Sequence, residues 1–232
     1  MFFQIVINIF EIIALVSGTM YVMKFKDEVL SRYFVYFLLF TVFVEIVFGW
    51  MPTAIYYLDS LKGLEHYFLL NNNNWIYNIY DTISFVFFLF LFTSLFNSKK
   101  VRKIGFLFTI LFLMFSIFNL VTSSEFFNAI VSLNFIVGSL LLLLYVIYFF
   151  FQMLFGDQIL DFYKTLPFYI GIGVVIYHLS STPIFIYSKY FSETKSPDFT
   201  KVYEIIITTA NIFVYTCYTL GFILCSRKNK SY

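Results

Sequence analysis

The chain has 232 residues, of which 61% are hydrophobic and only 12% charged, and its net charge is +2. Soluble globular domains average roughly 45–50% apolar and about 25% charged residues, so this composition excludes a protein whose surface is mostly in water. The small net charge, spread over short turns, also argues against a nucleic-acid partner.

Seven apolar segments follow one another along the chain. Crossing the hydrocarbon core takes about 20 residues of helix, and runs such as LLLLYVIYFFF lack the period of two that membrane strands would show. We therefore predict an all-α, multi-pass membrane protein: one domain, residues 1–232, forming a bundle of seven transmembrane helices. The expected helices are 2–23, 33–51, 75–96, 104–122, 126–155, 166–187 and 202–226. The fifth is too long to stand upright and should tilt or project.

The positions of lysine and arginine predict the orientation of the bundle. Eleven of the 15 basic residues follow expected helices 1, 3, 5 and 7. They are Lys24, Lys26, Arg32, Lys99, Lys100, Arg102, Lys103, Lys164, Arg227, Lys228 and Lys230. The other face has Lys62, Lys189, Lys195 and Lys201. The positive-inside rule places the N-terminus outside and the C-terminus in the cytoplasm.

The segments between the helices are short. Residues 98–103 and 123–125 are only long enough to join neighbouring antiparallel helices. The longest, Pro52 to Asn74, is rich in Leu, Tyr and Phe, which predicts a short interfacial helix followed by an asparagine turn. Ser188 to Lys201 is expected to be a hydrated loop. The first apolar segment lacks a basic region before it, so we expect it to be retained rather than removed as a secretory signal.

Polar side chains within the apolar segments are the candidates for function. Glu11 and Glu45 lie well inside their helices, where a carboxylate costs at least a few kcal/mol unless it is paired or protonated. The last helix carries a polar stripe spaced four, three, four and three residues apart, and that face is expected to look into the bundle. The stripe consists of Glu204, Thr208, Asn211, Tyr215 and Tyr218.

With the N-terminus outside, several of these polar groups fall at mid-membrane or in its outer half. The hypothesis is a polar pocket that opens outward and accepts a small polar or cationic ligand. Its expected lining is Glu11, Glu45, Asp81, His178, Asn211 and Tyr215. The competing interpretation is structural, because interior Ser, Thr, Asn and Tyr often only hydrogen-bond helices together, for about 0.6–2 kcal/mol per contact.

No motif for catalysis or metal binding stands out. The two histidines, His66 and His178, form no HxxxH or HExxH pattern, and the chain has no GxSxG and no glycine-rich phosphate loop. Cys217 and Cys225 share one helix and are poor candidates for a disulfide. We expect no catalytic residues, no metal and no cofactor, and therefore no enzyme activity.

Three stretches carry a loose resemblance. They are LPFYIGIGVVIYHLSSTPIFI (166–186), YNIYDTISFVFFLFLF (77–92) and NIFVYTCYTLGFILCSRK (211–228). In their aromatic pattern they resemble an uncharacterised family of small seven-helix inner-membrane proteins from Bacteroidota. The resemblance implies a fold and a location in the cytoplasmic (inner) membrane of a bacterium, and it carries no activity and no site residues.

Three kinds of function remain open. The first is a receptor-like sensor or signalling adaptor, with an outer pocket and a cytoplasmic partner that docks on Lys99, Lys100, Arg102 and Lys103. The second is a transporter or proton-coupled channel for a small solute, in which Glu11, Glu45 and Asp81 relay protons. The third is an accessory or structural membrane subunit whose polar stripes only pack helices. In each case the lipid bilayer is the surrounding solvent.

Overall fold

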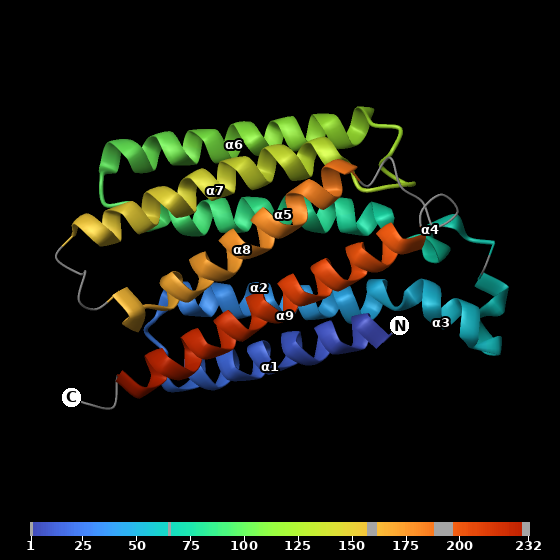
Figure 1. Cartoon of the computed structure of the whole chain (residues 1–232), viewed down its shortest axis with the longest axis horizontal. Helices are drawn as coiled ribbons and strands as arrows, with labels where there is room; N and C mark the ends of the chain where they lie inside the picture. Colours follow the sequence, from blue (N-terminus) through green and yellow to red (C-terminus); the bar gives the residue numbers. More distant parts are fainter. Residues whose placement is uncertain (1, 65, 157–161, 188–196, 229–232) are drawn as a thin grey trace.

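The structure is a computed structural model that describes residues 2–64, 66–156, 162–187 and 197–228. All of the secondary structure in its described part is helical (Figure 1). Seven spans are long and apolar enough to cross a membrane, as the sequence predicts. The long helices are α1 (Phe2–Lys24), α2 (Val29–Val44), α5 (Asn74–Ser94), α6 (Lys99–Thr122), α7 (Ser132–Phe155), α8 (Leu166–Tyr187) and α9 (Pro197–Lys228). The shorter elements are η1 (Glu45–Gly49), α3 (Met51–Tyr57), η2 (Asp59–Leu64), α4 (Phe68–Asn71) and η3 (Phe162–Lys164).

Six of the long helices surround a common centre. Helix α1 packs against α2 and α9, α9 packs against α8, α8 against α7, and α7 against α5. Helix α5 then meets α2 and closes the ring (Figure 1). Helix α6 lies outside this ring, packed mainly on α5 and more lightly on α7. Most of the residues that face the centre therefore come from α1, α2, α5, α7, α8 and α9, and η1 adds Glu45.

The contact between α2 and α5 is the thinnest in the ring. Its apolar part is formed by aromatic rings: Phe37 stacks on Phe87 with 4.2 Å between ring centroids, and Phe34 lies 6.5 Å from Phe88. Its polar part is a hydrogen bond of 3.0 Å between the hydroxyls of Thr41 and Tyr80. We call this contact, together with the bond from Tyr77 to Glu45 described below, the α2–α5 seam.

Helix α6 is fastened to the ring by buried polar contacts. The Asn119 amide donates to Asn134 (2.7 Å), and the Asn134 amide donates to the Ser116 hydroxyl (2.8 Å). The same Ser116 hydroxyl bonds the Thr82 hydroxyl at 2.8 Å, which links α5, α6 and α7 in one network. Here the structural interpretation of interior Asn, Ser and Thr holds, since each polar group is satisfied by another helix.

The fifth transmembrane helix is shorter than predicted. It begins at Ser132 instead of Phe126 and has 24 residues, so the predicted length was wrong, whereas its tilt stays a prediction. The cause is Asn78 on α5, whose amide donates to the carbonyls of Phe126 and Ala129, both at 2.9 Å. Its side-chain oxygen accepts from the Val131 backbone N–H, also at 2.9 Å. These three bonds hold residues 126–131 in a non-helical turn.

The second span is longer than predicted. Helix α2 runs into η1, a single π-helical turn, and then into α3, so one span of 29 residues reaches Tyr57. Pro52 is tolerated because it occupies the first turn of α3, where a missing N–H costs little. Part of the segment expected to be interfacial thus continues a transmembrane helix, and the remainder forms η2 and α4.

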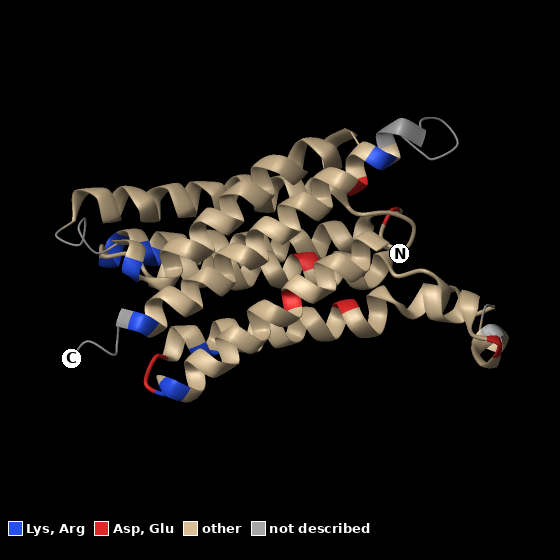
Figure 2. Cartoon of the chain, turned by 60° about the horizontal axis from the view of Figure 1, so that its bottom comes forward, with Lys and Arg blue, Asp and Glu red and all other residues tan. Residues whose placement is uncertain are grey.

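The charges are segregated along the bundle axis. Figure 2 shows Lys and Arg concentrated at the end where the C-terminus lies, while acidic residues also lie within the bundle. The expected loop 98–103 is mostly the first turn of α6, capped by the Ser98 hydroxyl, which accepts from the Val101 N–H. The common location of the basic residues agrees with the predicted topology; which end faces the cytoplasm stays a prediction. Lys189, Lys195 and Lys230 lie outside the described residues.

Replacing Asn78 with alanine is expected to destabilise the protein by about 2–3 kcal/mol, because it leaves three backbone groups at the start of α7 without partners. Thermal unfolding of the purified protein in detergent measures the loss. The matched control is Asn128→Ala in the same turn, since Asn128 is exposed and makes only a 3.5 Å bond to the Ser124 carbonyl. Equal stability of the two variants would contradict the anchoring role of Asn78.

Candidate functional site

The ring of helices encloses a cavity of about 420 Å³. The cavity extends from Tyr218 on α9 to Gln4 and Asn74, which lie near the end of the bundle that carries the N-terminus. Its size is within the range of about 300–1,000 Å³ that is typical of small-molecule sites. Helix α6 contributes nothing to its described lining.

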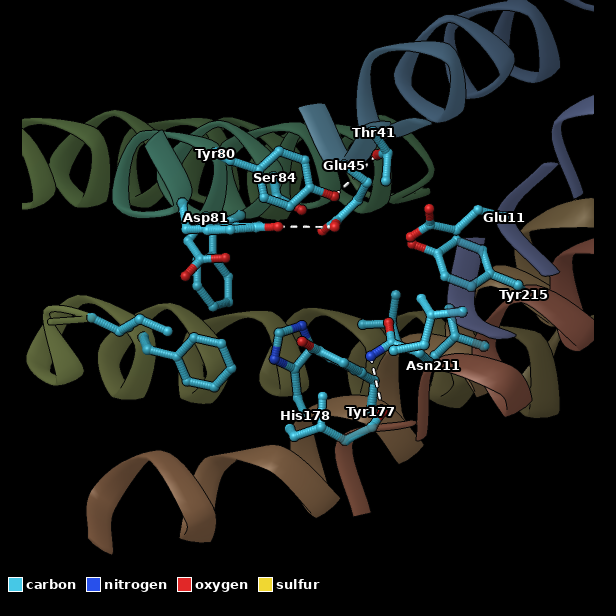
Figure 3. A pocket seen from close by; sticks show the side chains of 18 of the residues that line it. Glu11, Thr41, Glu45, Tyr80, Asp81, Ser84, Tyr177, His178, Asn211 and Tyr215 are labelled. Carbon is cyan, nitrogen blue, oxygen red and sulfur yellow. Dashed lines mark hydrogen bonds between the residues drawn. The ribbon is translucent and has the colours of Figure 1, made fainter. Parts of the chain in front are cut away.

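All six residues of the predicted pocket line this one cavity (Figure 3). They come from five separate elements: α1, η1, α5, α8 and α9. Glu11, Glu45, Asp81, His178, Asn211 and Tyr215 therefore form a single site in space, although whether the site binds a ligand remains a hypothesis. Glu204, the first member of the predicted stripe on the last helix, was wrongly expected to face inward. Its side chain is exposed, and the neighbouring Tyr203 lines the cavity instead.

Glu11 is the most enclosed of the three acids, with 2% of its surface exposed. Its carboxyl accepts a hydrogen bond of 2.9 Å from the Asn8 amide, one turn earlier on α1. The Asn8 oxygen accepts in turn from the Trp50 indole N–H at 2.8 Å. The Tyr215 hydroxyl lies against the same carboxyl from α9. Glu11 is thus held by polar groups on two other segments.

Glu45 is positioned by the π-helical turn. A π turn inserts an extra residue into a helix and re-aims the side chains around it, and such turns are frequent at functional sites. Here it places Glu45 on the cavity wall together with Thr41, one turn earlier. One carboxyl oxygen, Oε2, accepts from the Tyr77 hydroxyl of α5 at 2.9 Å. This bond forms the second polar part of the α2–α5 seam.

Asp81 differs from both glutamates. Its side chain lines the cavity from α5, and it forms no hydrogen bond with any residue that the structure describes. It lies close enough to the hydroxyls of Tyr177 on α8 and Tyr203 on α9 to interact with them electrostatically. The Glu45 carboxyl in turn interacts electrostatically with both Asp81 and Glu11.

The three carboxyls have no basic partner. Within residues 2–64, 66–156, 162–187 and 200–227, no lysine or arginine lines the cavity or pairs with any of them. Carboxylates inside a membrane protein normally pair with a cation or line a water-filled path, because a low dielectric makes an isolated charge costly. The cavity therefore lacks positive charge.

His178 has a structural environment of its own. Its Nδ1 lies 3.0 Å from the Ser139 hydroxyl of α7, and its ring packs between Phe85 (5.2 Å) and Phe135 (5.7 Å). The Asn211 amide donates to the Ile207 carbonyl of its own helix at 2.9 Å. Both residues are thus partly satisfied by the protein, and they form the wall opposite Glu45 (Figure 3).

Sequence reasoning missed most of the aromatic lining. Six tyrosines line the cavity: Tyr77, Tyr80, Tyr177, Tyr203, Tyr215 and Tyr218. The signal was present on α5, where Tyr77, Asp81, Ser84 and Phe88 follow at spacings of four, three and four. In a chain with 19 tyrosines and 35 phenylalanines this stripe does not stand out by composition.

A second, smaller cavity of about 340 Å³ lies at the basic end of the bundle. Its described lining includes Tyr21, Glu28, Ser31, Lys164 and Cys225. The Glu28 carboxyl there already accepts hydrogen bonds from the hydroxyls of Tyr21 (2.7 Å) and Ser31 (2.8 Å).

The linings of the two cavities are separated by residues 32–36 on α2 and by residues 219–224 on α9. Between them lie Phe34 and Phe222, whose ring centroids are 5.9 Å apart, and Phe34 also meets Tyr218 edge-on at 4.9 Å. Both phenylalanines are almost completely buried. A single aromatic layer thus closes the floor of the larger cavity.

No group of three metal-ligating side chains comes together among the residues that the structure describes. The predicted docking residues lie far from the cavity, in the first turns of α6, where Lys99, Lys100 and Lys103 are exposed and Arg102 is half-buried. Positive charge at a helix N-terminus opposes the helix macrodipole, so these residues do not stabilise α6. Their role in docking stays a prediction, as does the expected lack of enzyme activity.

The chain matches no known protein family, no curated protein and no solved structure. The resemblance to seven-helix proteins of Bacteroidota therefore stays a prediction. Any function must be argued from the cavity itself.

Replacing Gly49 with alanine tests the packing around Glu45. A Cβ at Gly49 would lie 2.7 Å from the Tyr77 hydroxyl and 3.0 Å from both Gln4 Nε2 and Glu45 Oε2. Gly49→Ala should therefore displace Tyr77 from Glu45 and lower stability by about 1 kcal/mol, overpacking outweighing the better helix propensity of alanine. Thermal unfolding measures this, with Gly63→Ala as the control because Gly63 faces open space. Increased stability of Gly49→Ala would show that the cavity wall yields freely.

Proposed function

We propose that this multi-pass membrane protein is a receptor-like sensor that binds a small cationic ligand in the cavity and passes the signal to a cytoplasmic partner. The observation that carries the proposal is the set of three carboxyls, from α1, η1 and α5, that share one cavity without a basic partner among the described side chains. A cation supplies the missing charge, and its attraction is strong where walls of low dielectric exclude water.

The aromatic walls also favour a cation. Rings of Tyr and Phe attract positive charge through the negative faces of their π systems, by about 0.5–2 kcal/mol per contact. Six tyrosines are distributed around the cavity and include residues from three helices, α5, α8 and α9. A wall of this kind binds an organic cation in preference to a strongly hydrated inorganic one.

The α2–α5 seam provides a route from the cavity to the rest of the bundle. Both of its hydrogen bonds, Thr41 to Tyr80 and Tyr77 to Glu45, are made by residues that line the cavity. A cation that pairs with Glu45 competes with the Tyr77 hydroxyl and changes how α2 is held against α5. Since helix contacts are packed in discrete arrangements, such a change is transmitted along α2 towards the basic end.

A transporter is the second candidate. It is favoured by the second cavity at the opposite end and by the thin aromatic layer, Phe34 and Phe222, between the two cavities. Movement of this layer would join the cavities into a path across the membrane, as alternating access requires.

Cation binding is expected to raise the melting temperature of the purified protein in detergent. A panel of choline, ethylammonium, 2-phenylethylammonium and guanidinium serves as probes, with sodium at the same ionic strength as the reference. Glu11→Gln and Glu45→Gln are expected to reduce the stabilisation, because each removes charge from the cavity. Glu204→Gln is the matched control, since this exposed acid lies on α9 outside the cavity.

If no cation of the panel raises the melting temperature, and the glutamine variants change only the stability of the protein itself, then the polar groups have only a packing role. Proteoliposomes loaded with the probe that binds separate the two candidates. A sensor retains the probe inside the vesicles, whereas a transporter releases it at a rate that depends on the protein.

The proposal requires the cavity to face outward. A cysteine introduced at Ser60, which is exposed in η2, should react with a membrane-impermeant maleimide in intact cells, whereas Lys100→Cys should react only after permeabilisation. The native Cys217 and Cys225 are buried and contribute little background. The opposite labelling pattern would place the cavity on the cytoplasmic side and overturn the sensing of an external ligand.

A further inference from the structure

We infer that Asp81 is the specific anchor of the cavity and that its ligand is a primary ammonium attached to an apolar or aromatic body. The inference rests on the proposed cation-binding function. It distinguishes the roles of three acids that charge alone would treat as equivalent.

The three acids differ in their hydrogen-bond partners. Glu11 is held by Asn8 and lies against Tyr215, and Oε2 of Glu45 accepts from Tyr77. Asp81 has no hydrogen-bond partner within the described residues, although its carboxyl lies in the interior of the bundle and points into the cavity (Figure 3). A structural carboxyl in this position would be paired, because leaving it without a partner costs free energy. A role in binding a hydrogen-bond donor accounts for the exception.

The surroundings of Asp81 fit the three N–H donors of a primary ammonium. One donor is directed at the Asp81 carboxyl. Tyr177 and Tyr203 line the same cavity, and their hydroxyl oxygens can accept hydrogen bonds from the others. A quaternary ammonium has no N–H to offer these oxygens, and hydrogen bonds between charged and neutral groups are worth about 1.5–3 kcal/mol each, which corresponds to roughly ten- to hundred-fold in affinity.

The remainder of the cavity is apolar on the side of Asp81. Phe85 lies one turn further along α5, and Phe88 follows it on the cavity wall. Phe135 and Phe185 also line it, with tilted rings whose centroids are 4.1 Å apart, and Phe135 meets Phe85 edge-on at 5.5 Å. An apolar or aromatic group attached to the ammonium would pack against these rings, whereas a negatively charged group would face the carboxyls that line the same cavity.

Contact with Asp81, Tyr177 and Tyr203 would join α5 to α8 and α9. These helices lie on different sides of the ring, with α7 between α5 and α8. The ammonium would therefore bridge walls that have no direct polar bond in the described structure, which gives the ligand a way to select one arrangement of the bundle.

The inference is tested by measuring the binding of 2-phenylethylammonium to the protein in detergent by calorimetry. The wild type is compared with Asp81→Asn, Glu11→Gln and the exposed control Glu204→Gln. We expect Asp81→Asn to weaken binding about ten- to hundred-fold, Glu11→Gln to weaken it by less than about three-fold because that carboxyl is already engaged, and Glu204→Gln to leave it unchanged. Asp81→Glu should restore part of the affinity by returning the charge.

Two ligand analogues test the same inference in the wild type, so the result does not depend on the folding of any variant. 2-Phenylethanol lacks the charge, and the N,N,N-trimethyl derivative keeps the charge without the N–H donors. We expect both to bind at least about ten-fold more weakly than the primary ammonium.

The outcomes separate this inference from the proposed function. If the wild type binds the trimethyl derivative as tightly as the primary ammonium, or if Glu11→Gln loses more affinity than Asp81→Asn, then the cavity binds cations but the assignment of the anchor is wrong. If no cation of any kind binds the wild type, the proposed function itself fails.

Discussion

Lipid cannot hydrate a polar side chain, and the rest of this structure follows from that constraint. Each polar group on a membrane-spanning helix must face another protein group or an internal space that admits water. The chain uses both solutions in different places. Asn119, Asn134, Ser116 and Thr82 satisfy one another between α5, α6 and α7, whereas Glu11, Glu45 and Asp81 gather around a cavity. The first set fixes a peripheral helix, and the second creates an interior with an unbalanced charge.

The same constraint explains how much the sequence could predict. The helices were found because crossing a bilayer needs about 20 apolar residues, and Leu166–Tyr187 has the predicted bounds. The six cavity residues were found because acids and amides at mid-membrane depth must turn inward in any helix order. Glu204 failed this reasoning because it lies near the N-terminal end of α9, where a side chain can reach water without facing the bundle.

The features that sequence reasoning missed depend on contacts between distant segments. The start of α7 is determined by Asn78, 53 residues before Val131, and no apolar count near residue 126 reveals that bond. The π turn at Glu45 is a local change of hydrogen-bonding register within a uniformly apolar run. The tyrosines of the cavity were hidden by the aromatic content of the chain, since a ring that faces lipid and a ring that faces a ligand have the same hydropathy.

The position of the cavity relative to the α2–α5 seam connects the site to the bundle. Five of the six contacts around the ring are extensive, whereas α2 and α5 meet through a few aromatic rings and two hydrogen bonds. Both bonds involve cavity residues, and one of them is accepted by the Glu45 carboxyl, which would attract a cation. The π turn directly after α2 supplies a second weak point, because its hydrogen bonds are not in α-helical register. In the proposed function, a bound cation would therefore act on the least constrained contact of the ring, whereas the pairs α1–α9 and α8–α9 are closely packed.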